Sequence, residues 1–286
     1  MRRTDSAPSG AFSREWLALR EDVDRRSRNG EVARTLAGRF ALRDHVSVVD
    51  LGAGTGANLR ATAEHLPQRQ SWRLIDKDDA LIDESRRLLK AWADRSEERD
   101  GRLFLTKGGS TIDVTFASID LAGDLPRALD GAVDLITASA FFDLVSPSFI
   151  QQLARLMTEK RASLYATLTY NGVQRWSPHR PLDSQMSGAF HRHQLGDKGF
   201  GPAAGPTAPA HLADQFRVSG YSVIEGDSPW HLDRADRMLI DELVRGHAFA
   251  VAETGLVDSK AIEGWVKVQR TGADVGHTDT FAAPAG

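Results

Sequence analysis

The sequence predicts an α/β fold in which helices cover both faces of a mostly parallel, doubly wound sheet. Short runs of β-branched and apolar residues alternate along the chain with segments whose apolar residues recur at helical spacing. The first of these strands, residues 46–51, is followed at once by a glycine-rich loop and a helical segment. Because each strand is followed by a helix, successive strands are expected to run in the same direction with helices on both faces.

The expected element boundaries follow from apolar periodicity and from helix-ending residues such as Pro67 and Gly255. Gly108 and Gly109 separate two short β-forming runs, which predicts a hairpin whose second arm enters the sheet. The expected strands lie at residues 46–51, 72–75, 103–105, 111–116, 133–137, 162–170, 221–224 and 275–281. The expected helices lie at residues 12–28, 32–40, 57–66, 80–92, 147–157, 236–253 and 259–270.

Composition and charge exclude several classes of chemistry. The 286 residues include no cysteine, which excludes disulfides, thiolate zinc sites, iron–sulfur clusters and cysteine nucleophiles. The 36 basic and 39 acidic side chains give a net charge of −3, which provides no field for gathering nucleic acid. No apolar run reaches the roughly 18–20 residues of a membrane span, and no apolar signal segment follows the first methionine. We therefore expect a soluble, cytoplasmic protein.

The loop after the first strand is the first candidate binding site. Gly52, Gly54 and Gly56 allow a tight turn, and their missing side chains let a ligand approach backbone N–H groups before the next helix. In an open sheet of this class, ligands bind at the carboxyl ends of the strands where the strand order reverses. The spacing G-x-G-x-G differs from the G-x-G-x-x-G of dinucleotide-binding loops, which disfavours a nicotinamide-dependent oxidoreductase.

Residues 48–59, Val-Val-Asp-Leu-Gly-Ala-Gly-Thr-Gly-Ala-Asn-Leu, resemble the first motif of class I S-adenosylmethionine-dependent methyltransferases. Asp76, at the end of the second strand, stands where this family carries the carboxylate that binds both ribose hydroxyls, and a carboxylate is the natural acceptor for a diol. The resemblance covers residues 46–170. It implies S-adenosyl-L-methionine as the cofactor. It also implies a Rossmann-like, seven-stranded sheet whose last strand runs antiparallel between the fifth and the sixth.

Two further loops resemble the family in the same order along the chain. Asp120 and Leu121, after the third strand, resemble the position at the adenine edge, and residues 138–143 resemble the loop beside the methionine and its methyl group. Each aspartate also has a local explanation, because aspartate is favoured at helix N-termini. The resemblance implies cofactor contacts at Asp50, Gly52, Ala53, Gly54, Gly56, Asn58, Asp76, Lys77, Asp120, Leu121 and Ser139.

Methyl transfer makes modest demands on a protein, because the sulfonium already activates the methyl group. The protein must align a nucleophile with the carbon–sulfur bond for SN2 displacement and must exclude water. Phe141, Phe142 or Trp16 offers an aromatic face to the cationic sulfonium. Arg20 or Arg26, in the first expected helix, is the predicted partner of the methionine carboxylate.

The polar segment after the fifth strand is the expected acceptor site. Residues 171–206 are rich in histidine and glycine and lie where a class I enzyme recruits its acceptor, so we expect a loop that lines the substrate pocket. The alternative is a polar loop whose histidines only make caps and turns. The candidates for catalysis are Tyr170, His191 and His193, and those for substrate binding are Phe142, Tyr170, His191, His193 and Lys198.

A zinc site in this segment is a weaker alternative. His191 and His193, together with His179 and Asp197, offer nitrogen and oxygen ligands. Their spacing matches none of the usual zinc patterns, and we expect no metal.

We expect one domain over residues 12–286, preceded by a disordered N-terminus at residues 1–11. The helical insertion between the last two strands is expected near the carboxyl edge of the sheet, where it could help to cover a pocket. The expected regions are an N-terminal helical lid (12–45), a cofactor-binding core (46–170), a substrate-loop region (171–215) and the last two strands with their insertion (216–286).

The leading functional hypothesis is a methyltransferase that uses S-adenosyl-L-methionine and a small-molecule acceptor. One alternative is a non-catalytic module that binds S-adenosylmethionine or a partner. Another is a methyltransferase of nucleic acid or protein, which the acidic balance disfavours. The Asn-Pro-Pro-Tyr loop of many amino-group methyltransferases is replaced by Ala138-Ser139-Ala140-Phe141. Neither the nucleophilic atom of the acceptor nor the oligomeric state follows from the sequence, because this fold serves many acceptors.

Overall fold

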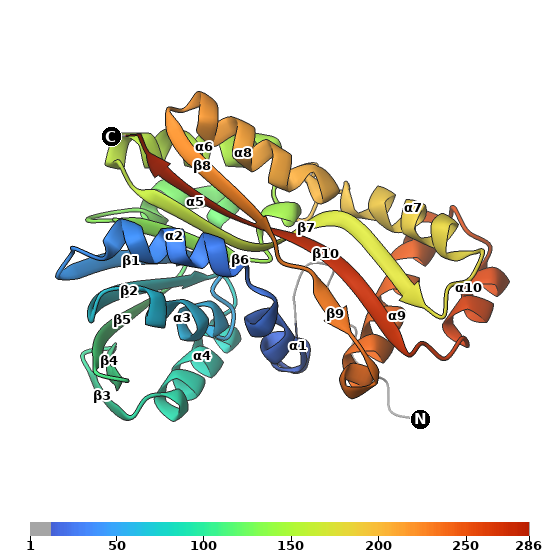
Figure 1. The fold of residues 1–286 in the computed structure, drawn as a ribbon, viewed down its shortest axis with the longest axis horizontal. Helices are drawn as coiled ribbons and strands as arrows, with labels where there is room; N and C mark the ends of the chain where they lie inside the picture. Colours follow the sequence, from blue (N-terminus) through green and yellow to red (C-terminus); the bar gives the residue numbers. More distant parts are fainter. Residues whose placement is uncertain (1–12, 286) are drawn as a thin grey trace.

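The computed structural model of the protein describes residues 13–285, so the disorder expected at residues 1–11 lies outside the described part. Within residues 13–285, ten strands form one sheet in the order β3-β4-β5-β2-β1-β6-β7-β10-β8, with β9 paired to β10 (Figure 1). The strands β5, β2, β1, β6 and β7 run parallel, and β10 runs antiparallel between β7 and β8. The predicted doubly wound sheet and the place of its last strand are confirmed.

All seven expected main strands are present, and β7 and β10 are much longer than expected. The strands β3 and β9 were not expected. Every residue of β3 is exposed and β9 has only three residues, so neither shows the apolar alternation that marks a strand. The strands are β1 (His45–Leu51), β2 (Arg69–Asp76), β3 (Arg95–Arg99), β4 (Arg102–Lys107), β5 (Ser110–Ser118), β6 (Leu135–Ser139), β7 (Ser163–Ser177), β8 (Tyr221–Asp227), β9 (Trp230–Leu232) and β10 (Gly272–Pro284).

Helices cover both faces of the sheet, α2, α3 and α4 on one and α5, α6 and α8 on the other (Figure 1). Several begin at side chains that accept N–H groups of the first turn, among them Asn29, Asp78 and Ser146. The helices α5, α7 and α8 were not expected. The helices are α1 (Arg14–Ser27), α2 (Gly30–Phe40), α3 (Ala57–Thr62), α4 (Asp79–Trp92), α5 (Leu121–Ala128), α6 (Pro147–Lys160), α7 (Asp183–Gln194), α8 (Ala208–Val218), α9 (Arg237–Thr254) and α10 (Ser259–Val266).

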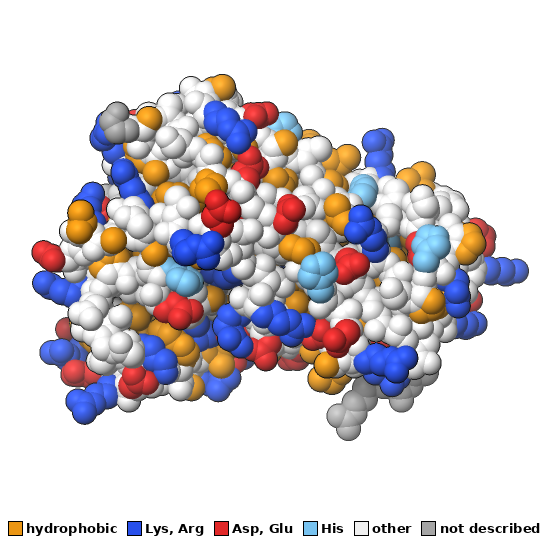
Figure 2. All heavy atoms as spheres, in the orientation of Figure 1, with side chains coloured by type: hydrophobic (Ala, Val, Ile, Leu, Met, Phe, Trp, Pro, Cys, Tyr) orange, Lys and Arg blue, Asp and Glu red, His pale blue; other side chains and the backbone are white. Residues whose placement is uncertain are grey.

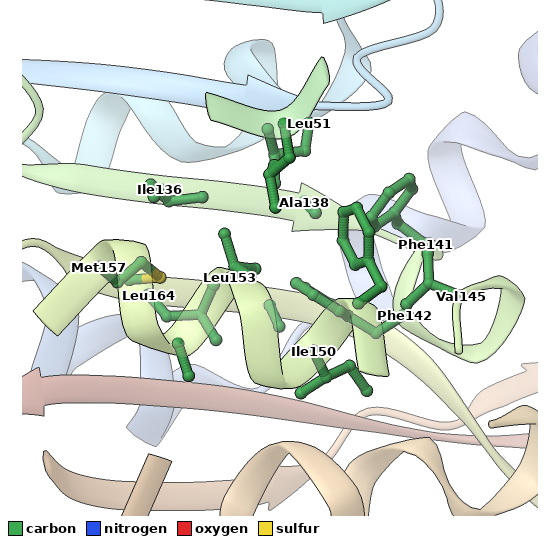
Figure 3. Packing of buried hydrophobic residues seen from close by; sticks show 14 of the residues in the cluster. Leu51, Ile136, Ala138, Phe141, Phe142, Val145, Ile150, Leu153, Met157 and Leu164 are labelled. Atoms are coloured by element: carbon green, nitrogen blue, oxygen red, sulfur yellow. The ribbon is translucent and has the colours of Figure 1, made fainter. Parts of the chain in front are cut away.

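Two apolar layers fill the space between the sheet and its helices. On one face, Ile136 and Leu164 of the sheet pack against Leu153 and Met157 of α6 (Figure 3). On the other face, Trp72 and its neighbours pack beneath α2, α3 and α4. Each fully buried aliphatic side chain stabilises the fold by about 1.5–3 kcal/mol. These layers hold the carboxyl ends of β1, β2 and β6 in fixed positions.

The strands β7 and β10 continue beyond the core sheet as a two-stranded antiparallel ribbon. Their pairing extends from Leu164 opposite Ala282 to Ser177 opposite Gly272. The strand β9 pairs with the start of β10, and α7, α9 and α10 pack on the ribbon around a third apolar cluster. In Figure 1 this outer part extends to the right of the core, and α1 lies below the ribbon between the two parts. The helical insertion predicted between the last two strands is thus part of this outer layer.

The expectation of a substrate loop at residues 171–206 is wrong for most of that segment. The strand β7 runs to Ser177, and residues 183–194 form α7. At Gly172 a register shift opposite β10 absorbs the positive φ, and the pairing continues. In α7 the buried residues Met186 and Ala189 have helical spacing, which their polar neighbours obscured.

A buried ion pair fixes α7 to the segment before β10. Arg270 Nη2 lies 2.6 Å from Asp183 Oδ1, and the two side chains are 1% and 8% exposed. Trp265 Nε1 donates to the same carboxylate at 2.7 Å. Burial opposes ionisation of Asp183, but the hydrogen bonds from Arg270, the backbone of Arg180 and Trp265 hold its pKa below the usual value.

We expect Asp183→Ala to lower the free energy of unfolding by about 3–5 kcal/mol, because the Arg270 guanidinium stays buried without its charge partner. Urea denaturation followed by tryptophan fluorescence measures this loss. The control is Asp274→Ala, which removes a pair with His231 whose side chains are 44% and 73% exposed, and we expect a loss below about 1 kcal/mol. Equal losses for the two variants would contradict a structural role for the buried pair.

The surface carries charges of both signs. On the face shown in Figure 2, the Lys and Arg side chains are interspersed with Asp and Glu. This pattern agrees with the net charge of −3 and gives this face no continuous basic stripe. Among the helices of residues 13–285, none is both long and apolar enough to cross a membrane.

Candidate functional site

The carboxyl ends of β1, β2 and β6 meet where the strand order reverses. Because β1 pairs with β2 on one side and with β6 on the other, the loops that follow these strands lie side by side. The three loops contribute the glycines at 52–56, Asp76 and residues 140–143. The structure therefore brings together three of the segments that the sequence pointed to.

The glycine loop has a backbone that other residues adopt only with strain. The φ angles of Gly52, Gly54 and Gly56 are +63°, +52° and +74°. A Cβ on Gly56 would lie 2.7 Å from Ser85 Oγ in α4, and a Cβ on Gly52 would lie 2.9 Å from Cδ2 of Phe141. The turn and the close packing on both sides thus require glycine here.

Asp76 is tied to the glycine loop. Its Oδ2 accepts the N–H of Gly54 at 2.8 Å, and its Oδ1 accepts the N–H of Asp78 at 3.0 Å. The N-cap of α4 is Asp78, whose Oδ1 accepts the N–H of Ala80. The alternative interpretation, that Asp76 is the N-cap of α4, is therefore wrong. Burial raises the pKa of Asp76 against the effect of these N–H groups, and the carboxylate keeps lone pairs for further donors.

Asp50 and Asn58 lie behind the glycine loop as a buried pair. Asn58 Nδ2 donates to Asp50 Oδ1 at 2.6 Å and to Thr137 Oγ1 at 3.0 Å. Arg28, which the sequence did not single out, donates to Asn58 Oδ1 at 2.8 Å. Burial raises the pKa of Asp50 to about 7. The contacts of Asp50 and Asn58 join β1, α3 and β6, and so these two residues position the loop.

The remaining predicted cofactor positions differ in exposure. Ala53 and Leu121 are buried, and Ser139 is half-buried at the end of β6. Lys77 and Asp120 are exposed. Asp120 Oδ1 accepts an N–H of the first turn of α5, so the local explanation as a helix cap holds for this residue.

The helix α1 covers the glycine loop. Leu17 Cδ1 lies 3.3 Å from the position of a Cβ on Gly54. The carboxylate of Glu21 pairs with Arg60 at 2.7 Å, and Arg60 also donates to the carbonyl of Thr55 at 2.8 Å. Together with Phe141 over Gly52, Leu17 closes the loop from the outside. A ligand that lies against this backbone must displace these two side chains.

Neither arginine predicted for the methionine carboxylate is free of acidic partners. Arg20 makes two hydrogen bonds to Asp24, at 2.8 and 3.2 Å, and its guanidinium lies 5.0 Å from the ring centre of Trp230. Arg26 pairs with Asp236 at 2.6 Å, and its side chain is 48% exposed. Arg20 is therefore part of the interior near β9, and Arg26 belongs to the surface.

The candidate acceptor residues divide into two groups on opposite sides of α7. Tyr170 Oη and His191 Nε2 lie 3.0 Å apart beside the ribbon. His193 lies two residues further along the helix and faces outward, with Nε2 2.8 Å from Glu253 and Nδ1 3.3 Å from Lys198 Nζ. Burial raises the pKa of Tyr170 and lowers the pKa values of His191 and Lys198.

Two buried polar residues near Tyr170 were missed by the sequence reasoning. Asp143 and His277 are 7% and 6% exposed, and in the described part of the chain Asp143 Oδ1 and His277 Nδ1 have no hydrogen-bond partner. Burial raises the pKa of Asp143 to about 6 and lowers that of His277 to about 3. Asp143 was considered only as part of a loop and His277 only as a strand residue. The strand also carries Asp274, Asp279 and two threonines, so no local signal set His277 apart.

The two phenylalanines after β6 have different surroundings. Phe142 is fully buried in the apolar cluster beneath the sheet, so its ring is part of the core (Figure 3). Phe141 makes edge contacts with Phe149 and Phe200 at ring-centre distances of 5.9 and 5.6 Å. Phe141 is therefore the one of the pair that lies against the glycine loop.

The side chains considered for zinc have separate partners. His179 Nδ1 lies 3.3 Å from Asp183, and Asp197 Oδ1 accepts the N–H groups of Gly199 and Gly201. Within the part of the chain that the structure describes, no group of three or more His, Asp or Glu side chains is arranged to hold a metal ion.

Comparison with solved structures identifies proteins of similar fold. No protein-family model and no curated protein sequence matches the chain. A protein of Bacillus halodurans C-125, provisionally named a methyltransferase, is similar in structure with a TM-score of 0.53 and 12% identity over 90% of this chain and 100% of that one. The chain thus shares the fold of that protein, and its sheet has the Rossmann-like strand order that the sequence resemblance implied.

Two weaker likenesses cover nearly the whole chain. A methyltransferase of Thiobacillus denitrificans, solved with S-adenosyl-L-homocysteine, has a TM-score of 0.45 and 16% identity over 95% of this chain and 99% of that one. The cyclopropane synthase MmaA2 of Mycobacterium tuberculosis has a TM-score of 0.47 and 12% identity over 98% of this chain and 100% of that one. At TM-scores below 0.5, neither likeness supports a functional conclusion.

We expect Gly56→Ala to lower the free energy of unfolding by about 1–3 kcal/mol, because alanine is strained at positive φ. The new Cβ must also displace the Ser85 hydroxyl. The control is Gly38→Ala within α2, where no atom lies within 4 Å of the added Cβ, and we expect it to be neutral or to stabilise by up to about 1 kcal/mol. Urea denaturation measures both, and an unchanged midpoint for Gly56→Ala would show that the loop is not constrained as described.

Proposed function

We propose that the protein is an S-adenosyl-L-methionine-dependent methyltransferase that acts on a small-molecule acceptor. The observation that carries the proposal is the Asp76 carboxylate, which is held 2.8 Å from the Gly54 N–H at the switch point of the sheet. The carboxylate offers hydrogen-bond acceptors for a diol. The three glycines beside it have positive φ angles and no side chains, so a flat ligand can approach their backbone closely.

The surrounding residues fit an adenosyl ligand. Asp76 would accept hydrogen bonds from the ribose hydroxyls, and the backbone of Gly52–Gly56 would lie against the methionine end. Asp120 and Leu121, which begin α5, would flank the adenine, and Ser139 would lie beside the methionine. Asp50 and Asn58 act from behind by fixing the position of the loop.

The bound cofactor supplies a methyl group that is already activated by the positive sulfur. The protein's own contribution is to orient the acceptor and to exclude water. Leu17 of α1 and the ring of Phe141 lie over the loop and can close again over a bound ligand. The hydrogen-bonded pair Tyr170 and His191, on β7 and α7, belongs to the acceptor side of the site, whereas His193 and Lys198 lie on the outer side of α7.

Two alternatives remain as outcomes of the test. A non-catalytic module would bind S-adenosylmethionine or a partner without ever forming S-adenosylhomocysteine. A methyltransferase of nucleic acid or protein would need a charged or extended docking surface, which the net charge of −3 and the mixed surface of Figure 2 disfavour.

We expect Asp76→Ala to weaken binding of S-adenosyl-L-methionine about 100-fold, because two hydrogen bonds to a charged acceptor are lost. Isothermal titration calorimetry with S-adenosylmethionine, S-adenosylhomocysteine and NAD measures this directly. Asp78→Ala is the matched control, since it removes a neighbouring carboxylate that only caps α4. We expect it to bind as the wild type does and to lose about 1 kcal/mol of stability.

If Asp76→Ala binds S-adenosyl-L-methionine as tightly as the wild type does, Asp76 does not bind the ribose of the cofactor. Binding of NAD in place of the adenosyl ligands would show that the glycine loop belongs to an oxidoreductase. Binding without any S-adenosylhomocysteine formed over a panel of acceptors would favour the non-catalytic module.

A further inference from the structure

Near the proposed methyl-transfer site, Asp143 and His277 each have a buried polar atom without a hydrogen-bond partner among residues 13–285. Asp143 Oδ1 and His277 Nδ1 are enclosed, and their residues are 7% and 6% exposed. A buried polar atom without a hydrogen bond costs about 1–3 kcal/mol. Such a cost is tolerated mainly where the atom has a function, and both atoms occur at the carboxyl end of the sheet.

Asp143 and His277 are placed around Tyr170 by different elements. Asp143 lies in the short helical turn Phe142–Leu144 that follows β6, and His277 on β10 is the register partner of Tyr170 on β7. The rings of Tyr170 and His277 are 6.2 Å apart between centres. The short turn that carries Asp143 packs against β7, the strand of Tyr170. The charge of Asp143 adds to burial in raising the pKa of Tyr170.

Aromatic rings from α1 and β9 continue this group. Trp230 lies 5.1 Å from the ring centre of His277 and 6.5 Å from that of Trp16. With Tyr170, these rings provide flat apolar surfaces beside the buried carboxylate. We name Asp143, Tyr170, His277, Trp230 and Trp16 the aromatic–carboxylate group.

Within the aromatic–carboxylate group, the charge of the Asp143 carboxylate is not fully balanced by a positive side chain. Arg20 lies over the rings of Trp16 and Trp230, at 5.9 and 5.0 Å, but its Nε and Nη2 are already bonded to Asp24. Because the guanidinium is already paired with Asp24, Arg20 offsets the negative charge of Asp143 only in part. A ligand that completes the group must therefore bring a hydrogen-bond donor, and an anionic ligand would be repelled.

We propose that Asp143 is a catalytic residue of the proposed methyltransferase, accepting the proton of an O–H or N–H nucleophile that is carried on a planar, largely apolar small molecule. This inference rests on the proposed function for the methyl donor, but the recognition of the acceptor depends only on the residues of the aromatic–carboxylate group. The aromatic rings pack against the planar body of the acceptor molecule, and the carboxylate accepts a hydrogen bond from its O–H or N–H group.

The chemical step balances with the groups named. The lone pair of the acceptor oxygen or nitrogen forms a bond to the methyl carbon. The carbon–sulfur bond breaks and its electron pair stays on sulfur, which leaves the neutral thioether S-adenosylhomocysteine. The acceptor proton passes to the Asp143 carboxylate and then to water as the product leaves. A positioned base of this kind contributes about 10²–10⁴ in rate.

The surroundings of Asp143 keep it able to accept a proton at neutral pH. Burial raises its pKa to about 6, while the charge of Arg20 and the N–H of Tyr170 oppose that rise. Burial and Arg20 together keep His277 neutral, with a pKa of about 3. Tyr170, which is bonded to His191, is a further ionisable group that the charge of Asp143 affects.

The test uses the full chain saturated with S-adenosylhomocysteine and three probes that share a naphthalene body and differ in one substituent. The probes are 2-naphthol, which has a donor, 2-methoxynaphthalene, which has none, and 2-naphthoate, which is anionic. We expect calorimetric titration to show 2-naphthol binding at least tenfold more tightly than either of the other two probes. We expect Asp143→Ala to abolish that tenfold preference, because the acceptor atom is gone.

Asp143→Asn separates binding from proton transfer. Its amide oxygen still accepts a hydrogen bond, so 2-naphthol should bind within about threefold of the wild type. Its rate of 2-naphthol methylation should fall at least 100-fold, because the amide does not take the proton. Asp130→Ala, which removes an exposed carboxylate before β6, should leave both properties unchanged.

Each outcome decides between the two proposals. If 2-naphthol and 2-methoxynaphthalene bind equally, if neither binds, or if Asp143→Ala keeps the preference, the role of Asp143 is overturned. If the wild type does not bind S-adenosylhomocysteine, the proposed function fails, and the same titrations without it still test the aromatic–carboxylate group. Circular dichroism of each variant confirms folding. Should Asp143→Ala not fold, Asp143→Asn supplies the decisive comparison.

Discussion

The antiparallel pairing of β7 with β10 is the constraint on which the rest of the structure depends. It inserts the last strand of the core sheet between β7 and β8, and it continues outward as the ribbon on which α7, α9 and α10 pack. The same pairing places Tyr170 opposite His277, three residues beyond Thr167, where the pairing of β7 with β6 ends. One set of backbone hydrogen bonds therefore builds both the outer layer and the wall of the candidate acceptor site.

A buried carboxylate ties this ribbon to the N-terminal helices. Asp279 Oδ1 accepts the N–H of Leu168 at 2.7 Å, where φ is +54°, and Oδ2 accepts the N–H of Asn29 at 2.8 Å. Asn29 in turn caps α2, directly after α1. The strained backbone of β7 and the corner between α1 and α2 are thus held by one side chain. This corner sets where α1 lies over the glycine loop.

The part of the chain proposed to bind the cofactor was predictable because its signals are local. The order of strand, glycine loop and helix identifies β1 and α3, and the resemblance at residues 48–59 then implied the strand order and Asp76. The acceptor half depends on contacts between distant segments. No local pattern in β7 shows that Tyr170 contacts His277, which lies 107 residues further along the chain. The helix α7 was missed because polar residues surround its few buried ones. Asp143 is likewise ordinary in sequence, and only burial without a partner marks it.

The central claim is that the glycine loop and Asp76 form the binding site of the methyl donor. A crystal structure of the protein with S-adenosylhomocysteine tests this most directly. We expect the ribose hydroxyls within hydrogen-bonding distance of Asp76, with the side chains of Phe141 and Leu17 moved off Gly52 and Gly54. A ligand bound elsewhere in the molecule, with the loop still covered as it is now, would contradict the account.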